Sequence, residues 1–294
     1  MNFALQLVFA GVCVGATYAL IAIGLTLTFW STRTMNFGQG SLLMVAAVAA
    51  ATLMSSKWSA WLAVPAALVL TTVLMIAVER IAIRPLAKTG GSMGWVVATL
   101  GFGLLLQGIV ARFFGSQAIM FPSLVFGPLD FLAIAGVRVS AQYLTVLGCC
   151  LALVAVMELF IRRTHWGRAV RAVAHDADAA ALAGVPVKRV VVASFAASGV
   201  LAGLAGILIS QVTGTVDPQF GFNLVILGFV AAVFGGMGSI VGALVGGMAL
   251  GVAEKLAGGY LSTAFGDAVA FAILMAVLAV RPQGLFGSRE VVKV

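Results

Sequence analysis

Long apolar stretches follow one another along almost the whole chain, separated by short polar segments. Six of them approach the roughly 20 residues that a helix needs to cross a bilayer core of about 30 Å. These six stretches cover residues 3–30, 59–78, 92–111, 141–161, 190–210 and 265–280. The pattern therefore predicts a protein that crosses a membrane several times.

Two further apolar stretches are irregular. Residues 36–54 begin with polar and glycine residues, and residues 222–253 are too long for one crossing and are interrupted by Gly-Gly-Met-Gly-Ser at 235–239. The part before that interruption spans only about 20 Å at 1.5 Å per residue. We therefore expect an all-α integral membrane protein, a helical bundle of eight or nine membrane segments, some broken or re-entrant. Residues 1–294 are expected to form one transmembrane domain.

The composition agrees with a membrane protein and excludes several other classes. Hydrophobic residues make up 62% of the 294 residues, charged residues only 9%, and the mean hydropathy is +1.16. These values exclude an ordinary soluble domain and a disordered chain. The three cysteines, Cys13, Cys149 and Cys150, lie within spans without a CxxC spacing and are expected to pack as small apolar side chains. No nucleotide-binding or hydrolytic motif occurs, so no cofactor, metal or catalytic residue is expected.

The basic residues orient the predicted spans. Alternating the spans places most of the 17 lysines and arginines on one side, and the Lys/Arg-rich side of a membrane protein is the cytoplasmic one. The N-terminus is then outside and the C-terminus is cytoplasmic, in a multi-pass protein of the cell inner (cytoplasmic) membrane. This placement also explains the net charge of +8 without a nucleic-acid partner.

Glycines and rare charged residues describe the interior of the spans. Many of the 35 glycines are spaced by four, as in Gly11/Gly15 and Gly247/Gly251, which predicts close helix packing; faces that slide between two states are the other interpretation. Charges within spans are nearly absent, which argues against a proton pump or ion-coupled carrier. Glu158 and Arg162 are expected to form a surface ion pair.

Glu254 stands near the expected end of one span, beside Lys255, and Asp267 begins the next. Anchoring roles are expected for these three residues. Whether Glu254 is functional or structural stays open.

Uncharged polar residues within spans are the candidates for a translocation pathway. They are Thr17, Thr28, Asn36, Gln39 and Gln107. A helix that starts inside the membrane near residues 36–39 would direct free N–H groups toward a neutral or carboxylate-bearing solute. Equally, Asn36 and Gln39 would cap and brace a broken helix.

The longest predicted cytoplasmic loop, residues 162–189, is polar and basic at both ends. Asp176 and Asp178 favour the N-terminus of a short helix, residues 177–183 have high helix propensity, and Gly184 followed by Pro186 ends it. Such a helix is either a docking element or an ordinary solvated loop helix.

Seven segments carry a resemblance to a known family. The sequence DAAALAG at 178–184 resembles the E-A-A-x-x-x-G coupling motif of ABC importer membrane subunits, with Asp178 in place of Glu. Six further segments are GATYALIAIGLTL at 15–27, NFGQG at 36–40, GRAVRAVA at 167–174, AGLAG at 202–206, GGMGS at 235–239 and RPQGLFG at 281–287. In this order they resemble segments of branched-chain amino acid (leucine/isoleucine/valine) ABC importer permeases.

The resemblance implies a transport subunit that is not itself an enzyme. It would form half of a pathway with a second permease subunit (as a heterodimer or a homodimer), two cytoplasmic ATPase subunits and a periplasmic substrate-binding protein. The residues implied in ATPase coupling are Arg168, Arg171, Asp176, Asp178, Ala180 and Gly184. Urea, short amides or other small carboxylates are alternative cargoes, and an ion-coupled secondary transporter is the alternative in another class.

Overall fold

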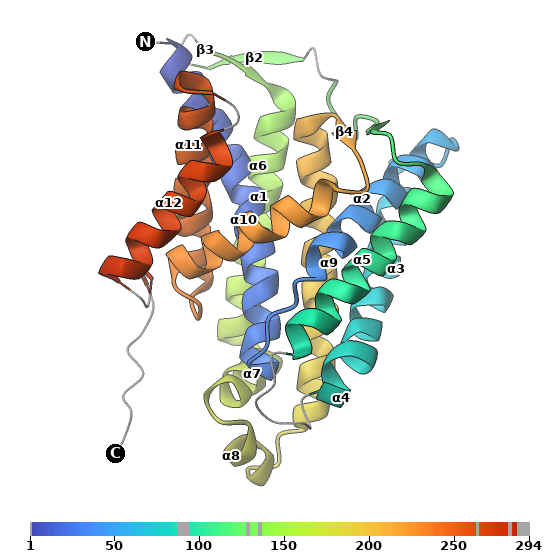
Figure 1. Cartoon of the computed structure of the whole chain (residues 1–294), viewed down its shortest axis with the longest axis vertical. Coiled ribbons are helices and arrows are strands. Elements are labelled where there is room, and N and C mark those ends of the chain that lie inside the picture. The colour runs from blue at the N-terminus through green and yellow to red at the C-terminus, as the bar shows by residue number, and fades with distance from the viewer. Residues whose placement is uncertain are drawn as a thin grey trace.

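The computed structural model describes residues 2–86, 94–127, 130–134, 137–262, 265–281 and 284–286. Most of these residues are helical, and the helices stand side by side (Figure 1). Six helical segments of the described chain are long and apolar enough to cross a membrane. They contain α1 (Asn2–Thr32), α3 (Ala60–Val78), α5 (Gly94–Phe114), α6 (Ala141–Arg163), α9 (Val187–Thr213) and α11 (Ile240–Tyr260). The multi-pass helical character predicted from the sequence is confirmed.

Three apolar helices are shorter: α2 (Gln39–Ser55), α10 (Phe220–Gly235) and α12 (Phe265–Val280). At 1.5 Å per residue, α10 is only about 24 Å long, less than a bilayer core of about 30 Å. The predicted interruption after α10 is present, and the Ser239 hydroxyl accepts a hydrogen bond from Gly242 N at 2.9 Å to start α11. The number of complete crossings and the orientation in the membrane stay predictions.

Helix α1 lies at the centre of the bundle, and 72% of its most apolar 18-residue stretch is buried. It packs against α9, α10 and α11, and its glycines allow the closest of these approaches. A Cβ added to Gly15 would meet Met248 Cα at 2.6 Å, and one added to Gly11 would meet Val252 Cα at 2.5 Å. Van der Waals contact between backbones is what small residues provide in a membrane. The prediction of close helix packing is confirmed, while sliding stays a prediction.

Two expected span ends lie inside longer helices. The stretch expected to end at residue 78 continues through a π-helical turn, η1 (Glu79–Ile83), into α4 (Arg84–Leu86). Glu79 is therefore a buried carboxyl within a continuous apolar helix, and its Oε2 atom has no hydrogen-bond partner among the described residues. The sequence had suggested spans with almost no charged residues, because local hydropathy places Glu79 just beyond the end of the expected span 59–78.

Glu254 was expected at the end of a span, but α11 continues to Tyr260. Its carboxylate accepts a hydrogen bond from the Tyr18 hydroxyl at 2.7 Å and lies 3.2 Å from Lys255 Nζ. The Tyr18 contact ties α11 to α1, as an anchoring role requires. The predicted ion pair between Arg162 and Glu158 is confirmed, and the side chain of Asp267 lies outside the described residues.

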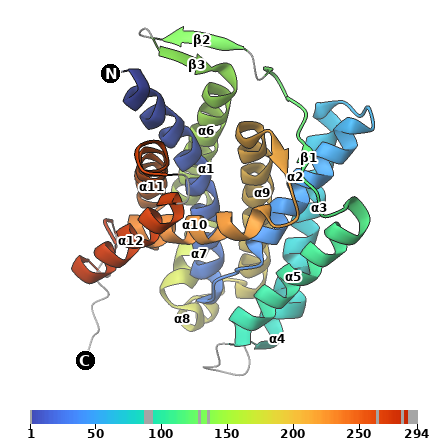
Figure 2. The same cartoon turned by 45° about the horizontal axis from the view of Figure 1, so that its top comes forward.

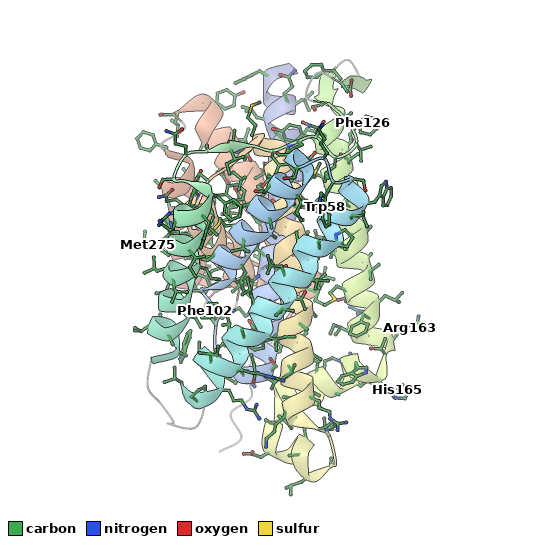
Figure 3. All side chains as sticks on the ribbon, turned by 90° about the vertical axis from the view of Figure 1, so that its right-hand side faces the viewer. Trp58, Phe102, Phe126, Arg163, His165 and Met275 are labelled. Atoms are coloured by element: carbon green, nitrogen blue, oxygen red, sulfur yellow. The ribbon has the colours of Figure 1, made fainter. Side chains whose placement is uncertain are left out.

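The expectation of a purely α-helical chain needs one correction, because short strands cover one end of the bundle (Figure 2). β2 (Phe131–Ile134) and β3 (Val137–Ser140) pair antiparallel, as do β1 (Ile119–Met120) and β4 (Thr215–Val216). Strand pairing satisfies backbone groups in the connections that follow α5 and α9. Trp58 and Phe126 lie toward this end, whereas Arg163 and His165 lie toward the other (Figure 3).

Candidate functional site

The segment between α6 and α9 holds two helices rather than the one expected from the sequence. The additional helix is α7 (His165–His175), which begins where Gly167 N donates to Thr164 Oγ1 at 3.0 Å. Its buried side consists of Gly167, Val170 and Val173. This i, i+3, i+6 spacing was the available signal, and the motif lead-in expected over residues 167–174 is in fact this amphipathic helix.

The predicted short helix is present as α8 (Ala177–Leu182). Asp176 Oδ1 accepts hydrogen bonds from Asp178 N at 3.0 Å and from Ala179 N at 2.9 Å, as a helix N-cap does. Gly184 has a φ of +85°, the left-handed conformation in which glycine ends helices. The start and the end predicted from Asp176 and Gly184 are therefore both confirmed.

Burial divides the predicted coupling residues into two groups. Asp176, Asp178 and Gly184 are exposed, but Ala180 is only 4% exposed and packs into the main hydrophobic core. Ala180 therefore attaches α8 to the bundle, and its expected role in ATPase coupling stays a prediction. Leu182, which the sequence reasoning did not select, is 91% exposed. Leu182 is therefore an apolar side chain that stands in solvent on an otherwise polar loop.

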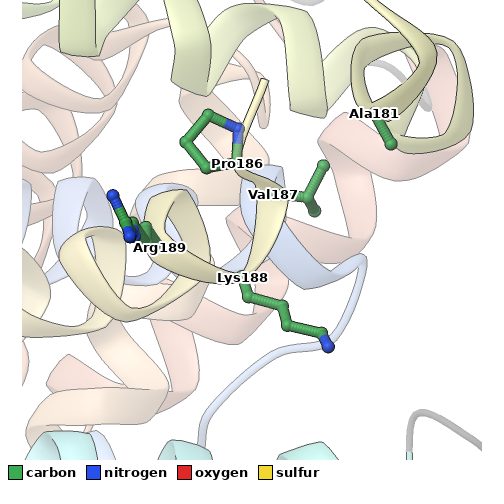
Figure 4. Close-up of a pocket in the computed structure, with 5 residues that line it drawn as sticks. All are labelled: Ala181, Pro186, Val187, Lys188 and Arg189. Atoms are coloured by element: carbon green, nitrogen blue, oxygen red, sulfur yellow. The ribbon is translucent and has the colours of Figure 1, made fainter. Parts of the chain in front are cut away.

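A hollow of about 400 Å³ lies beside α8, where the chain enters α9 (Figure 4). Its lining joins apolar side chains to two cationic ones, and consists of Ala181, Pro186, Val187, Lys188 and Arg189. We call this hollow together with the exposed side of α8 the docking surface.

Arg168 and Arg171 lie on α7 and are exposed, away from the buried side of that helix. The Arg168 guanidinium lies 2.7 Å from His165 Nδ1, so it lies along its own helix. The described part of the chain holds no group of three or more His, Cys, Asp or Glu side chains arranged to hold a metal ion.

The predicted pathway residues on α1 have their polar groups satisfied within the chain. Thr17 Oγ1 donates to Val14 O at 2.6 Å, and Thr28 Oγ1 donates to Leu25 O at 2.9 Å. Both threonines are fully buried. Their hydroxyls therefore bond back to the helix, as threonines within helices commonly do.

Asn36 and Gln39 hold the break between α1 and α2 together. Asn36 Oδ1 accepts from Gly38 N at 3.0 Å, while Gln39 Nε2 donates to Ile21 O at 3.1 Å and Gln39 Oε1 accepts from Ser198 Oγ at 3.2 Å. Both side chains are fully buried. Of the two interpretations left open by the sequence, the contacts favour the brace.

The N-terminus of α2 is also covered by another helix. The backbones of Gly40 in α2 and Gly221 in α10 approach so closely that a Cβ on either glycine would overlap the other's carbonyl group. This contact leaves no room for a solute at the second residue of α2. Gln107 differs from the other candidates, because its side chain is partly exposed on α5.

The comparisons with known proteins now decide the family. The sequence model of the family described as "Branched-chain amino acid transport system / permease component" matches residues 7–278. The chain belongs to this family. It is 36% identical to the high-affinity branched-chain amino acid transport system permease protein LivH of Salmonella typhimurium, over 99% of this chain and 97% of the relative. It is 34% identical to BraD of Pseudomonas aeruginosa, over 99% of this chain and 98% of that protein.

A solved structure supports the fold of this family member. The chain superposes with a TM-score of 0.53 on PsaBC from Streptococcus pneumoniae in complex with Fab, at 12% identity, over 96% of this chain and 93% of the other. At this identity the likeness concerns the fold alone. The family's members are membrane transport components, so the expectation of a transport subunit, inferred above from seven short segments, is confirmed.

Proposed function

We propose that this chain is the membrane-spanning permease subunit of an ATP-binding-cassette importer for branched-chain amino acids. The observation that carries the proposal is the end-to-end identity with LivH and BraD, whose names describe permease proteins of a high-affinity branched-chain amino acid transport system. Urea, short amides and other small carboxylates are the alternative cargoes, to be separated by experiment. A periplasmic binding protein would deliver the solute.

The proposed location is the inner membrane of the cell. The proposed orientation places the N-terminus outside and the C-terminus in the cytoplasm. It is supported by the exposed basic residues of the 162–189 segment, because Lys/Arg-rich loops stay in the cytoplasm. In Figure 1, this segment and the N-terminus lie at opposite ends of the bundle. The strand-covered end would then face the periplasm.

Coupling to two ATPase subunits would use the docking surface. Leu182 offers an apolar anchor that fits a groove, and Asp178 stands beside it with its carboxylate in solvent. Closure of the ATPases on ATP would draw the α8 helices of the two permease subunits together. Because Ala180 is packed in the core, that displacement would reach the membrane helices as a rigid-body motion.

The second permease subunit would pack against α5. Only 22% of the most apolar 18-residue stretch of α5 is buried. On its outward side, a Cβ added to Gly101 or Gly108 would have no atom within 4 Å. Exposed glycines of this kind let a second helix approach closely in lipid. Gln107 borders this side, so it is the predicted pathway residue that stays a candidate for lining the route between the two subunits.

The function is tested with purified complex in proteoliposomes. We expect uptake of radioactive leucine that needs ATP, the ATPase subunits and the binding protein, and that excess isoleucine or valine abolishes. The same vesicles receive labelled urea and a simple carboxylate as matched cargo controls. Leucine uptake by this chain alone, without ATP, would instead establish a secondary transporter, and preferred uptake of urea would replace the cargo.

The coupling role of α8 is tested by substitutions that leave the core untouched. Leu182→Asp removes the apolar anchor from a fully exposed position and should abolish assembly with the ATPases while insertion stays normal. Gly184→Val forces a β-branched residue into the left-handed conformation, whereas Gly184→Asn tolerates it and serves as the control. Normal ATPase binding and uptake in both Leu182→Asp and Gly184→Val would exclude α8 as the coupling element.

A further inference from the structure

The end of α1 contacts the segment that carries α8 through a residue that the sequence did not single out. Arg33 follows the last residue of α1, and its Nη2 atom donates a hydrogen bond to the backbone carbonyl of Ala174 at 2.5 Å. The residues are 141 positions apart. The contact therefore joins α1 directly to the last turn of α7, two residues before the Asp176 cap of α8.

The carbonyl of Ala174 is available because the helix breaks between α7 and α8. In an uninterrupted helix it would accept from Asp178 N, but that group donates to Asp176 Oδ1 instead. A guanidinium at the C-terminal end of α7 also has the charge that the helix dipole favours there. The arginine thus pairs with a carbonyl at the end of α7 that has lost its helical donor and lies next to α8.

The backbone of Arg33 has a conformation that is strained for any residue other than glycine. Its φ is +56°, in the left-handed region where glycine is preferred and other residues are strained. Its Cζ atom lies 5.9 Å from the centre of the Phe29 ring, so the side chain folds back over the last turn of α1 toward α7. Ending α1 would be easier for glycine, so the guanidinium contact is what arginine contributes here.

Arg33 is also the first residue of the break that Asn36 and Gln39 brace. A displacement of α7 therefore has a short route to the start of α2: from Ala174 O to Arg33, and along three residues of backbone to Asn36. We propose that Arg33 is a positioning residue that transmits the movement of the coupling segment to α1 and to the break before α2. This inference rests on the proposed ATP-driven function.

The test compares three side chains at position 33 in the reconstituted complex with its ATPases. Arg33→Gly removes the guanidinium and relaxes the backbone, while Arg33→Lys keeps a donor on a strained backbone. If Arg33 transmits the movement, the number of leucine molecules imported per ATP hydrolysed should be highest in the unaltered complex, lower in Arg33→Lys and lowest in Arg33→Gly. The loss in Arg33→Gly should be about fivefold or more. ATP hydrolysis and thermal stability should stay close to those of the unaltered complex.

A role limited to ending α1 predicts a different order, in which Arg33→Gly couples best and Arg33→Lys equals the unaltered complex, because glycine suits the left-handed conformation while arginine and lysine are strained there alike. That order, or equal coupling in all three complexes, would overturn the inference. Should Arg33→Gly not assemble, Arg33→Gln is measured in the same way, with a coupling loss expected and normal coupling contradicting the inference. Arg162→Gln removes another exposed arginine from the same end and should leave coupling unchanged. If the unaltered complex shows no ATP-driven uptake, the proposed function itself fails, which is a distinct result.

Discussion

Helices α1 and α5 both carry glycines on one side, but these glycines meet very different surroundings. In α1, an added Cβ on Gly15 would come within 2.6 Å of Met248 Cα, whereas in α5 Gly101 and Gly108 have nothing within 4 Å. The most apolar 18-residue stretch is 72% buried in α1 and only 22% buried in α5. The same residue type therefore marks a contact already made within the chain in α1, and a surface left open in α5.

The inward side of α5 shows that this openness is one-sided. Thr99, Gly103, Leu106 and Val110 are buried, and a Cβ on Gly103 would meet Ser41 Oγ at 2.9 Å. These four positions repeat at helical spacing and pack α5 onto α2. The side with Gly101 and Gly108 lies roughly opposite. Helix α5 is thus fixed to its own subunit by one side while the other stays available for a partner.

The largest expected effect is on stability and contrasts the two helices directly. Gly15→Leu should destabilise the folded subunit by about 3 kcal/mol because the side chain has no space between α1 and α11. Gly108→Leu adds the same atoms in open space and should leave stability unchanged. Thermal denaturation of the two purified variants in detergent measures the difference, and equal stabilities would mean that the α1–α11 packing does not hold the fold.

The next effect concerns the assembled transporter. Although Gly108→Leu should not affect the isolated subunit, it should weaken pairing with the second permease subunit by filling the surface that a neighbouring helix needs. Co-purification of the two subunits measures pairing, with Val73→Leu on the exposed side of α3 as the control. Undiminished pairing would place the partner elsewhere on the chain.

A smaller loss of stability is expected at the brace. Gln39→Ala removes the amide that bonds Ile21 O and Ser198 Oγ, and leaving a buried hydroxyl such as that of Ser198 without its partner costs about 1–3 kcal/mol. Ser198→Ala removes one partner and should cost less. The double variant should lose less than the sum of the two single losses, because the two side chains share one hydrogen bond. Additive losses would show that the hydrogen bond contributes nothing.

The last comparison concerns the access of a thiol reagent to the two candidate pathway positions and needs no change in stability or transport. In a background in which the exposed Cys149 is replaced by serine, Gln107→Cys should react with a membrane-impermeant maleimide during ATP turnover. Gln39→Cys should stay unreactive, since the position is fully buried. Mass spectrometry after labelling measures both. Reaction at position 39 and none at position 107 would restore the break before α2 as the pathway and remove α5 from it.

Much of the fold was predictable because the membrane imposes a local rule. Backbone groups in lipid must be satisfied within the segment, so a long apolar stretch is a helix whatever surrounds it. The interruption at residues 235–239 and the ends of α8 were predictable for a similar reason, since glycine and a capping aspartate act on their own neighbourhood. The ion pair between Glu158 and Arg162 lies within one helix turn and is equally local.

What the sequence left undecided depended on which side of each helix meets a neighbour. Asn36 and Gln39 were equally suited to a pathway and to a brace, and only Ile21, Ser198 and Gly221, brought in from other helices, favour the brace. Ala180 and Leu182 are two apolar residues of one short helix, and packing alone buries the first and exposes the second. Hydropathy is a property of single residues, whereas burial is a property of the contacts they make. The sequence therefore determined most of the membrane helices and the main breaks between them, and the tertiary structure decided which polar groups are satisfied inside and which surfaces stay open.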